Sequence, residues 1–166
     1  QEELLVRANG LPERKGKALF RDFWDEHRGV KVWQEDLWEE YKRYGEVECL
    51  TGRRRRAPLS TNKVYNSPVQ GTASDIVVDA MRRLARRSWE LDWPSICPVM
   101  NIHDDLTFIV EESEFDEAVD EIVREMVFPV YNWIDVPISV EVEVGRDWGN
   151  QEEYGEYFSD DYYDHG

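Results

Sequence analysis

Residues 99–110 read VMNIHDDLTFIV, and this stretch decides the fold. Its two apolar runs, 99–103 and 106–110, are typical of strands, and only Asp104 and Asp105 lie between them. Two residues between two such runs indicate a β-hairpin, and aspartate is well suited to turns. The stretch therefore predicts an antiparallel hairpin with two adjacent carboxylates at its exposed tip.

These two carboxylates suit a hard divalent cation. The stiff strands on either side would hold Asp104 and Asp105 in place and leave them open to solvent. Mg²⁺ commonly takes one or two carboxylates from a protein and completes its shell with water and substrate phosphates. The alternative is that the two aspartates and the neighbouring His103 form only a turn.

Upstream of the hairpin, the sequence predicts helices. A first helix is expected from 11–13 to Gly29, and a second from about Val30 to Tyr44. Both carry apolar stripes at helical spacing, which we expect to pack in a core rather than to bind a ligand. A long helix is expected from Val69 to about Leu91.

Downstream of the hairpin, an acidic amphipathic helix is expected from Glu114 to about Val127, followed by a strand over 138–144, where apolar and polar residues alternate. Residues 150–166 contain six Asp and Glu and no Lys or Arg, and we expect them to form a disordered acidic tail. Helices and antiparallel strands in this order predict an α+β fold, with the sheet packed against several helices.

The net charge of −16 hides an asymmetry along the chain. Residues 51–90 contain nine Lys and Arg against three Asp and Glu, whereas residues 91–166 contain two against 21. A polyanion such as DNA would therefore bind at the basic segment. Four arginines near the end of the long helix suit either that role or the helix dipole: Arg82, Arg83, Arg86 and Arg87.

Composition narrows the class of protein. No apolar run approaches the 18 or so residues that a membrane helix needs, and no basic-then-apolar leader precedes the first helix. The two cysteines, Cys49 and Cys97, are too few for a disulfide framework or a zinc site. We expect a cytoplasmic protein, and the first residue, Gln1, suggests a trimmed or split product.

Two further segments carry polar side chains that suit nucleic acid. Residues 51–58 form a loop rich in guanidinium groups, and residues 66–72 read NSPVQGT, just at the expected start of the long helix. The amides of Asn66 and Gln70 both donate and accept, so they suit base edges in a minor groove. The alternative is that Asn66 caps the helix and Gln70 is an ordinary surface residue.

Four motifs occur in a fixed order, namely GRRR at 52–55, NSPVQGTASDI at 66–76, IHDDL at 102–106 and VPISVEVEVGRDWG at 136–149. In this order they resemble the C-terminal part of family A DNA polymerases, the bacterial polymerase I group and its phage relatives. The resemblance covers about residues 13–149. It implies that residues 1–149 are a C-terminal palm portion, in which the hairpin is catalytic, and that residues 150–166 are a separate tail.

The resemblance also implies roles for the hairpin tip. Asp104 matches the palm aspartate that binds the two catalytic Mg²⁺ ions, and His103 matches the histidine that lies against the primer terminus. Asp105 stands where the family usually has Glu, one methylene longer, and is a second candidate metal ligand. Asp104 and His103 are the expected catalytic residues.

Contacts with primer–template DNA follow from the same resemblance. Two amides would line the minor groove at the newest base pair, and three arginines would lie near the nucleic-acid cleft. The family tends to carry an arginine four residues before the first amide, where this chain has Asn62 with Lys63 next to it. The expected DNA-binding residues are Arg53, Arg54, Arg55, Lys63, Asn66, Gln70 and His103.

Two parts of the family pattern are missing from this sequence. The family has a second metal aspartate on an earlier palm strand, and a fingers helix with Lys, Arg and Tyr that grips the incoming dNTP. The first residues, 1–5, look like sequence just past that helix. We therefore expect a DNA-directed DNA polymerase that transfers a nucleotide from dNTP to a primer 3′-hydroxyl by a two-metal mechanism, together with an upstream segment or subunit.

Two other functions fit parts of the sequence. A metal-dependent phosphohydrolase could use His103 and Asp104, but such sites need several histidines, and only His27 and His103 precede the tail. A non-catalytic DNA- or protein-binding module could recruit a basic partner through its acidic tail.

Overall fold

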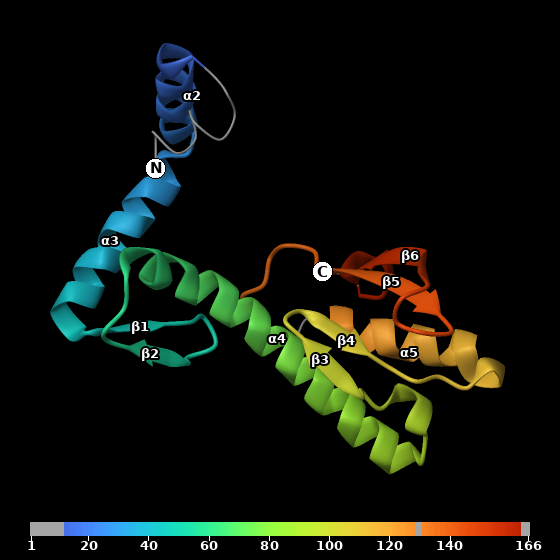
Figure 1. Ribbon diagram of the computed structural model, residues 1–166. Coiled ribbons are helices and arrows are strands. Elements are labelled where there is room, and N and C mark those ends of the chain that lie inside the picture. Colours follow the sequence, from blue (N-terminus) through green and yellow to red (C-terminus); the bar gives the residue numbers. More distant parts are fainter. Residues whose placement is uncertain (1–11, 129–130, 164–166) are drawn as a thin grey trace. The chain divides into compact units, whose positions relative to one another are not determined.

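Helices and short antiparallel strands make up the part of the chain that the computed structural model describes, residues 12–128 and 131–163 (Figure 1). The helices are α2 (Glu13–Glu26), α3 (Arg28–Tyr44), α4 (Thr61–Leu91) and α5 (Phe115–Val127). The strands are β1 (Glu46–Glu48), β2 (Arg54–Arg56), β3 (Met100–Ile102), β4 (Asp105–Thr107), β5 (Ser139–Gly145) and β6 (Gln151–Phe158). The α+β prediction is confirmed.

The described strands form three antiparallel pairs, β1–β2, β3–β4 and β5–β6. The chain divides into two compact units, residues 1–71 and 72–166. The boundary falls inside α4, so one helix belongs to both units. The first unit contains the β1–β2 pair and the second contains the other two.

In the first unit, α2 and α3 differ from the predicted helices in two ways. The break lies at His27 rather than at Gly29, which is inside α3. The apolar stripe of α3 is not a core, because no described residue of this helix is buried and Trp33 is 39% exposed. An apolar stripe indicates that one face of a helix can pack against another surface, but it does not show that such a surface is present in the same chain. The predicted cap at Gly45 is confirmed, with a φ of 71°.

The long helix α4 begins at Thr61, not at Val69, so Pro68 lies in its interior. An interior proline removes one backbone hydrogen bond and normally breaks a helix, which is why the sequence predicted a start beside it. Here Val64, Ser67 and Pro68 are buried in the fold, and their packing offsets that cost. Asn66 therefore lies within the helix, and the alternative that it caps the helix is wrong.

In the second unit, α5 lies between two apolar clusters. On one side, Ala118 and Ile122 pack with Leu84 of α4 and with Leu106 of β4. On the other side, Val119, Val123 and Val127 pack against residues of β5 and β6 and the aromatic side chains that follow them: Val140, Val142, Tyr157, Tyr162 and Tyr163. The hairpin β3–β4 and the hairpin β5–β6 are thus anchored through the same helix.

The prediction of a disordered acidic tail is wrong for residues 151–161. Residues 151–158 form β6, which pairs with β5, and a 3₁₀ turn follows at Ser159–Asp161. The acidic composition hid an alternating strand, in which Tyr157 faces α5 while Glu156 is exposed. Residues 164–166 lie outside the described part of the chain.

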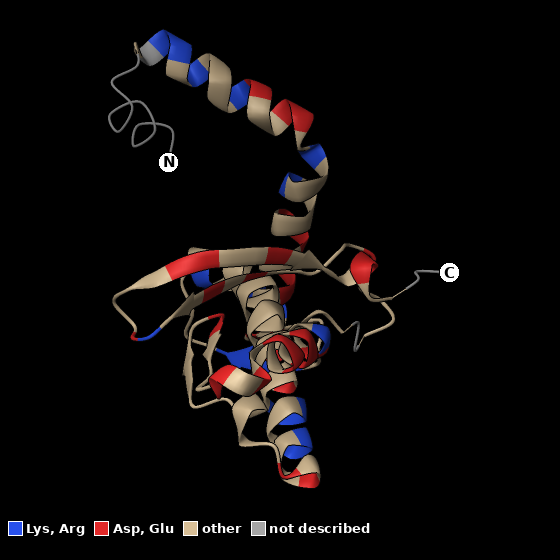
Figure 2. Ribbon diagram, turned by 90° about the vertical axis from the view of Figure 1, so that its right-hand side faces the viewer, with Lys and Arg blue, Asp and Glu red and all other residues tan. Residues whose placement is uncertain are grey.

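Ion pairs join α4 to α5 and account for two of the four arginines near the end of α4. The Arg83 Nε donates to a Glu125 carboxylate oxygen at 2.8 Å, and Arg87 pairs with the buried Glu121. Arg82 and Arg86 instead pair within α4, with Asp79 and Glu90. In Figure 2, blue ribbon segments mark the Lys and Arg positions of α4, and red segments mark the Asp and Glu positions of β5 and β6.

Candidate functional site

The predicted hairpin exists, and its tip carries the candidate metal ligands. The predicted position of the turn is wrong by one residue, because Ile102 pairs with Asp105. His103 and Asp104 form the turn, and Asp105 is the first residue of β4. The side chains of His103, Asp104 and Asp105 are exposed. Leu106, in the middle of β4, packs against the apolar cluster beside α5, and so do Phe108 and Val110 at the base of the hairpin. The tip is therefore open to solvent and its base is fixed in a core.

Backbone geometry makes this turn unusual. His103 has a φ of 59°, in the left-handed region that favours glycine. The side chain of Asn101 supports the turn from β3, because its Nδ2 donates to the carbonyl oxygen of Asp105 at 3.2 Å and to that of His103 at 3.5 Å. A non-glycine residue in this conformation costs about 1–3 kcal/mol, which the surrounding contacts must offset.

The donor set at the tip fits Mg²⁺. Within the described residues, neither Asp104 nor Asp105 takes part in an ion pair, so their oxygens remain available. One or two carboxylates are the usual protein contribution to a Mg²⁺ site that also binds phosphates. No group of three or more His, Cys, Asp and Glu side chains suited to a metal ion occurs in residues 12–128 and 131–163.

The arginines predicted to bind DNA lie on and beside the β1–β2 hairpin. Side chains alternate along a strand, so Arg54 and Arg56 share one face with Glu46 and Glu48. Arg54 Nε contacts Glu48 at 2.7 Å and its Nη1 contacts Glu46 at 2.8 Å. The negative charge of Glu48, followed by that of Glu46, raises the pKa of Arg54. This face of the hairpin is an exposed lattice of opposite charges.

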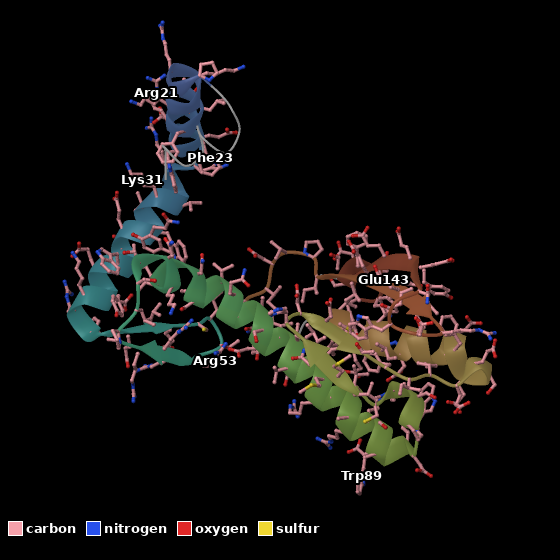
Figure 3. The ribbon with its side chains drawn as sticks, in the orientation of Figure 1. Arg21, Phe23, Lys31, Arg53, Trp89 and Glu143 are labelled. Atoms are coloured by element: carbon pink, nitrogen blue, oxygen red, sulfur yellow. The ribbon has the colours of Figure 1, made fainter. Side chains whose placement is uncertain are left out.

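The other face of the hairpin meets α4. Val47 of β1 is buried, Arg53 Nη2 donates to the carbonyl oxygen of Gly71 at 2.9 Å, and Arg55 Nη1 donates to Ser67 Oγ at 3.5 Å (Figure 3). The predicted arginine loop is thus part loop and part strand. The sequence missed β2 because consecutive arginines have no apolar alternation.

Three of the predicted DNA-binding residues share one exposed face of α4. Lys63, Asn66 and Gln70 are spaced by three and four residues, the spacing that brings side chains together on a helix. The neighbouring stripe, which contains Val64 and Ser67, is buried. The helix therefore presents two amides and one ammonium group side by side.

Two residues with clear contacts at these sites escaped the sequence analysis. Asn101 supports the turn of the candidate metal site. Asparagine side chains often bond to the backbone of a nearby turn, so its position two residues before the turn could have indicated this role. Arg56 has a side chain 82% exposed, against 55% for Arg54, and its Nε contacts Glu46 at 3.4 Å. Arg56 is the last of four consecutive arginines, and this run in the sequence could have indicated that it belongs with the other three.

The model of the DNA polymerase family A matches residues 1–150 of this chain. The chain belongs to DNA polymerase family A. This family A chain is 34% identical over 150 residues to the thermostable DNA polymerase I of Thermus filiformis, a match that covers 84% of this chain and 17% of that relative. It is 28% identical over 150 residues to DNA polymerase I of Bacillus subtilis strain 168, with 84% and 17% covered. The chain thus spans about a sixth of the length of these relatives.

A solved structure supports the family A fold. The POL domain of Pol1 from M. smegmatis, in complex with DNA primer-template and dNTP, has a TM-score of 0.68 to this chain at 23% identity. The match covers 76% of this chain and 24% of the solved one. Among the helices of the described residues, none has the length and hydropathy that crossing a bilayer requires.

Proposed function

We propose that this family A chain contributes a palm portion, residues 1–149, to a DNA-directed DNA polymerase, which transfers a nucleotide from dNTP to a primer 3′-hydroxyl. The observation that carries the proposal is the exposed carboxylate pair at the tip of a hairpin whose base is fixed in a core. The family resemblance supports a catalytic role for this tip. The cytoplasm, where DNA and dNTP are found, is the proposed compartment.

Each residue at the tip has a proposed task. Asp104 and Asp105 would hold Mg²⁺ through their carboxylate oxygens, and His103 would lie against the primer terminus. When bound, Mg²⁺ stabilises the charge on the attacking and leaving oxygens of the phosphoryl transfer. His103 and Asp104 form the turn that joins the two strands, and Asp105 is the first residue of β4. A second aspartate, from a segment or subunit that carries the earlier palm strand, would complete the site.

The arginine hairpin and α4 have the task of binding DNA. Arg53, Arg54 and Arg55 would contact phosphates, because a guanidinium group matches phosphate geometry. Three residues on one face of α4 would follow the primer–template: Lys63, Asn66 and Gln70. Amides read the minor groove only as A·T against G·C, so they would register the shape of a base pair more than its sequence.

The proposal is tested with Asp104→Asn in primer extension, with the chain joined to an upstream palm and fingers segment. We expect the rate to fall on the order of a thousandfold, because losing a metal ligand removes several kcal/mol of transition-state stabilisation. Primer–template binding should change less than about twofold, because Asp104 would contact metal rather than DNA.

Two controls accompany this test. Glu112→Gln removes an exposed carboxylate of the same unit and should leave extension unchanged. Extension by the 166-residue chain alone would contradict the need for a second aspartate from elsewhere. An equal loss of binding and rate in Asp104→Asn would mean that this residue has a structural role.

The alternative of a non-catalytic module depended on an acidic tail available to a partner. Residues 151–158 instead pair with β5, and Tyr157 packs on α5. Deleting this segment would therefore remove part of a core, so a loss of partner binding after deletion would not separate the two functions.

A further inference from the structure

A set of close contacts joins the β1–β2 hairpin to α4 within the first unit. The Cys49 thiol donates to the carbonyl oxygen of Ser67 at 3.3 Å, and Arg53 Nη2 donates to the carbonyl oxygen of Gly71 at 2.9 Å. We call these four residues the hairpin–helix seam. In Figure 3, Arg53 lies at the loop end of the hairpin, beside α4.

Gly71 allows the seam to close. A methyl group at this position would lie 2.3 Å from the Sγ of Cys49 and 3.2 Å from the Nη2 of Arg53. The first distance is far below the roughly 3.5–4 Å at which nonbonded carbon atoms make favourable contact. The backbone of α4 can therefore approach the hairpin this closely only without a side chain at Gly71.

The seam meets α4 beside the proline in its interior. Pro68 has no backbone N–H, so this turn lacks one of its internal hydrogen bonds. The donors from Cys49 and Arg53 reach carbonyl groups on either side of this proline. They add hydrogen bonds from outside the helix to a turn that has lost one of its own.

The proposed DNA-reading amides belong to the same turn. Asn66 directly precedes Ser67, and Gln70 directly precedes Gly71. A shift of the backbone at either seam carbonyl therefore moves the adjacent amide. Because a hydrogen bond weakens steeply with misalignment, a small rotation of this turn is enough to lose contact with a base edge.

We infer that Arg53 and Cys49 are positioning residues, which fix the turn 66–71 of α4 so that Asn66 and Gln70 meet the minor groove of the primer–template. Arg53 acts in this way through the Gly71 carbonyl, in addition to any phosphate it contacts. The inference rests on the proposed function and names the structural support of its DNA contacts.

The test measures how strongly DNA binding by the full chain depends on a hydrogen-bond acceptor in the minor groove. The probes are two primer–template duplexes, one of which carries 3-deazaadenine in the terminal primer pair and so lacks the N3 acceptor. We expect wild type to bind the modified duplex about fivefold more weakly, the effect of one hydrogen bond. Fluorescence anisotropy gives this affinity ratio, and a salt titration gives the number of phosphate contacts.

Gly71→Ala should bring the affinity ratio close to one, because the new methyl group forces the turn away from Cys49. The salt slope should not change, because no charge is removed. Adding Cys49→Ala removes the Sγ that the methyl group would meet, but it also removes the thiol donor to Ser67. The double variant should therefore recover part of the wild-type ratio, the part that the Arg53 contact supports. The matched control is Gly29→Ala, where a methyl group meets nothing within 4 Å and the ratio should stay as in wild type.

Two results overturn the inference: a folded Gly71→Ala that keeps the wild-type ratio, or a double variant whose ratio is no higher than that of Gly71→Ala. A wild-type ratio near one is a different failure, because it contradicts the proposed minor-groove contact itself. If Gly71→Ala does not fold, Arg53→Gln decides, since it introduces no clash. A positioning role lowers its affinity ratio, whereas a phosphate contact alone weakens both duplexes equally and reduces the salt slope by about 0.9.

Discussion

At the scale of single residues, Glu114 shows how local hydrogen bonds set a charge state. Its Oε2 accepts from Ser95 Oγ at 2.6 Å and from Trp93 Nε1 at 2.8 Å. These donors, Ser95 before Trp93, lower the pKa of Glu114. The contact ties the segment after α4 to the start of α5. Nothing in the sequence indicated it, since the three side chains meet only when the two segments pack.

This contact predicts a pH dependence of stability. Because the pKa of Glu114 is lower in the folded state, its stabilisation is complete above the ordinary glutamate pKa of about 4.3 and is lost as the pH falls through the folded value. Glu114→Gln should therefore lower the Tm near neutral pH, and the difference from wild type should shrink in acid. Thermal unfolding from pH 3 to 7 measures it, with Glu112→Gln as the control for losing one carboxylate.

A difference that stays constant across this pH range would show that Glu114 does not act through its charge.

At the residue scale the sequence also had clear limits. It identified the hairpin, which is confirmed, because turn residues between apolar runs are a local signal. It placed the turn at Asp104 and Asp105, one residue later than the turn at His103 and Asp104 in the structure. It did not indicate that His103 would adopt a positive φ or that Asn101 would support the turn. Those features depend on the register of the two strands, which side-chain packing selects.

At the scale of elements, the ion pairs between α4 and α5 give two arginines near the end of α4 a structural partner, which the sequence analysis did not predict. Arg83 is 17% exposed and contacts Asp79 of its own helix as well as Glu125 of α5. Its guanidinium carbon also lies 5.3 Å from the centroid of the Phe128 ring. These contacts give Arg83 a role in helix packing.

Arg83→Met is therefore expected to lower the free energy of unfolding by about 1–3 kcal/mol, because it leaves two carboxylates without their shared cation in a partly buried site. Arg82→Met is the matched control, one residue earlier in the chain. Its side chain is 63% exposed and pairs with Asp79 of the same helix, so the expected loss is within about 1 kcal/mol. Urea unfolding compares the two, and equal losses would contradict the packing role.

The elements also mark where sequence patterns fail. The helix α5 was predicted well, because its apolar face repeats at helical spacing over its whole length. The strand β6 was missed because acidic and aromatic residues with a glycine resemble a disordered segment. Its stability comes from pairing with β5 and from contacts with α5. Neither partner can be recognised from the composition of 151–158.

At the scale of the whole molecule, the net charge of −16 affects both the stability of the fold and the binding of DNA. Carboxylates stand opposite each other across the β5–β6 pair, Glu141 with Glu156 and Glu143 with Glu153. Like charges in such positions destabilise a strand pair, and an excess of one sign repels itself throughout a folded chain.

Added salt is therefore expected to act in opposite directions on the two properties. Screening should raise the Tm as NaCl increases, whereas affinity for primer–template DNA should fall with a log–log slope of about 0.9 per phosphate contact. Thermal unfolding with EDTA present and anisotropy titrations over the same NaCl range measure both. A Tm that falls with salt would mean that attractive ion pairs outweigh the net repulsion.

The sequence by itself determined the family, the fold class, the hairpin that carries Asp104 and Asp105, and the helical spacing of Lys63, Asn66 and Gln70. These are local patterns, or motifs in a fixed order, and each is readable without knowing what packs against it. Tertiary structure alone decided that α4 continues through Pro68, that residues 151–158 form a strand, and that Arg53 reaches the carbonyl of Gly71. In each case the local sequence favours the observed structure only weakly or favours another one. Contacts with residues distant in the sequence supply the stabilisation that outweighs this local preference.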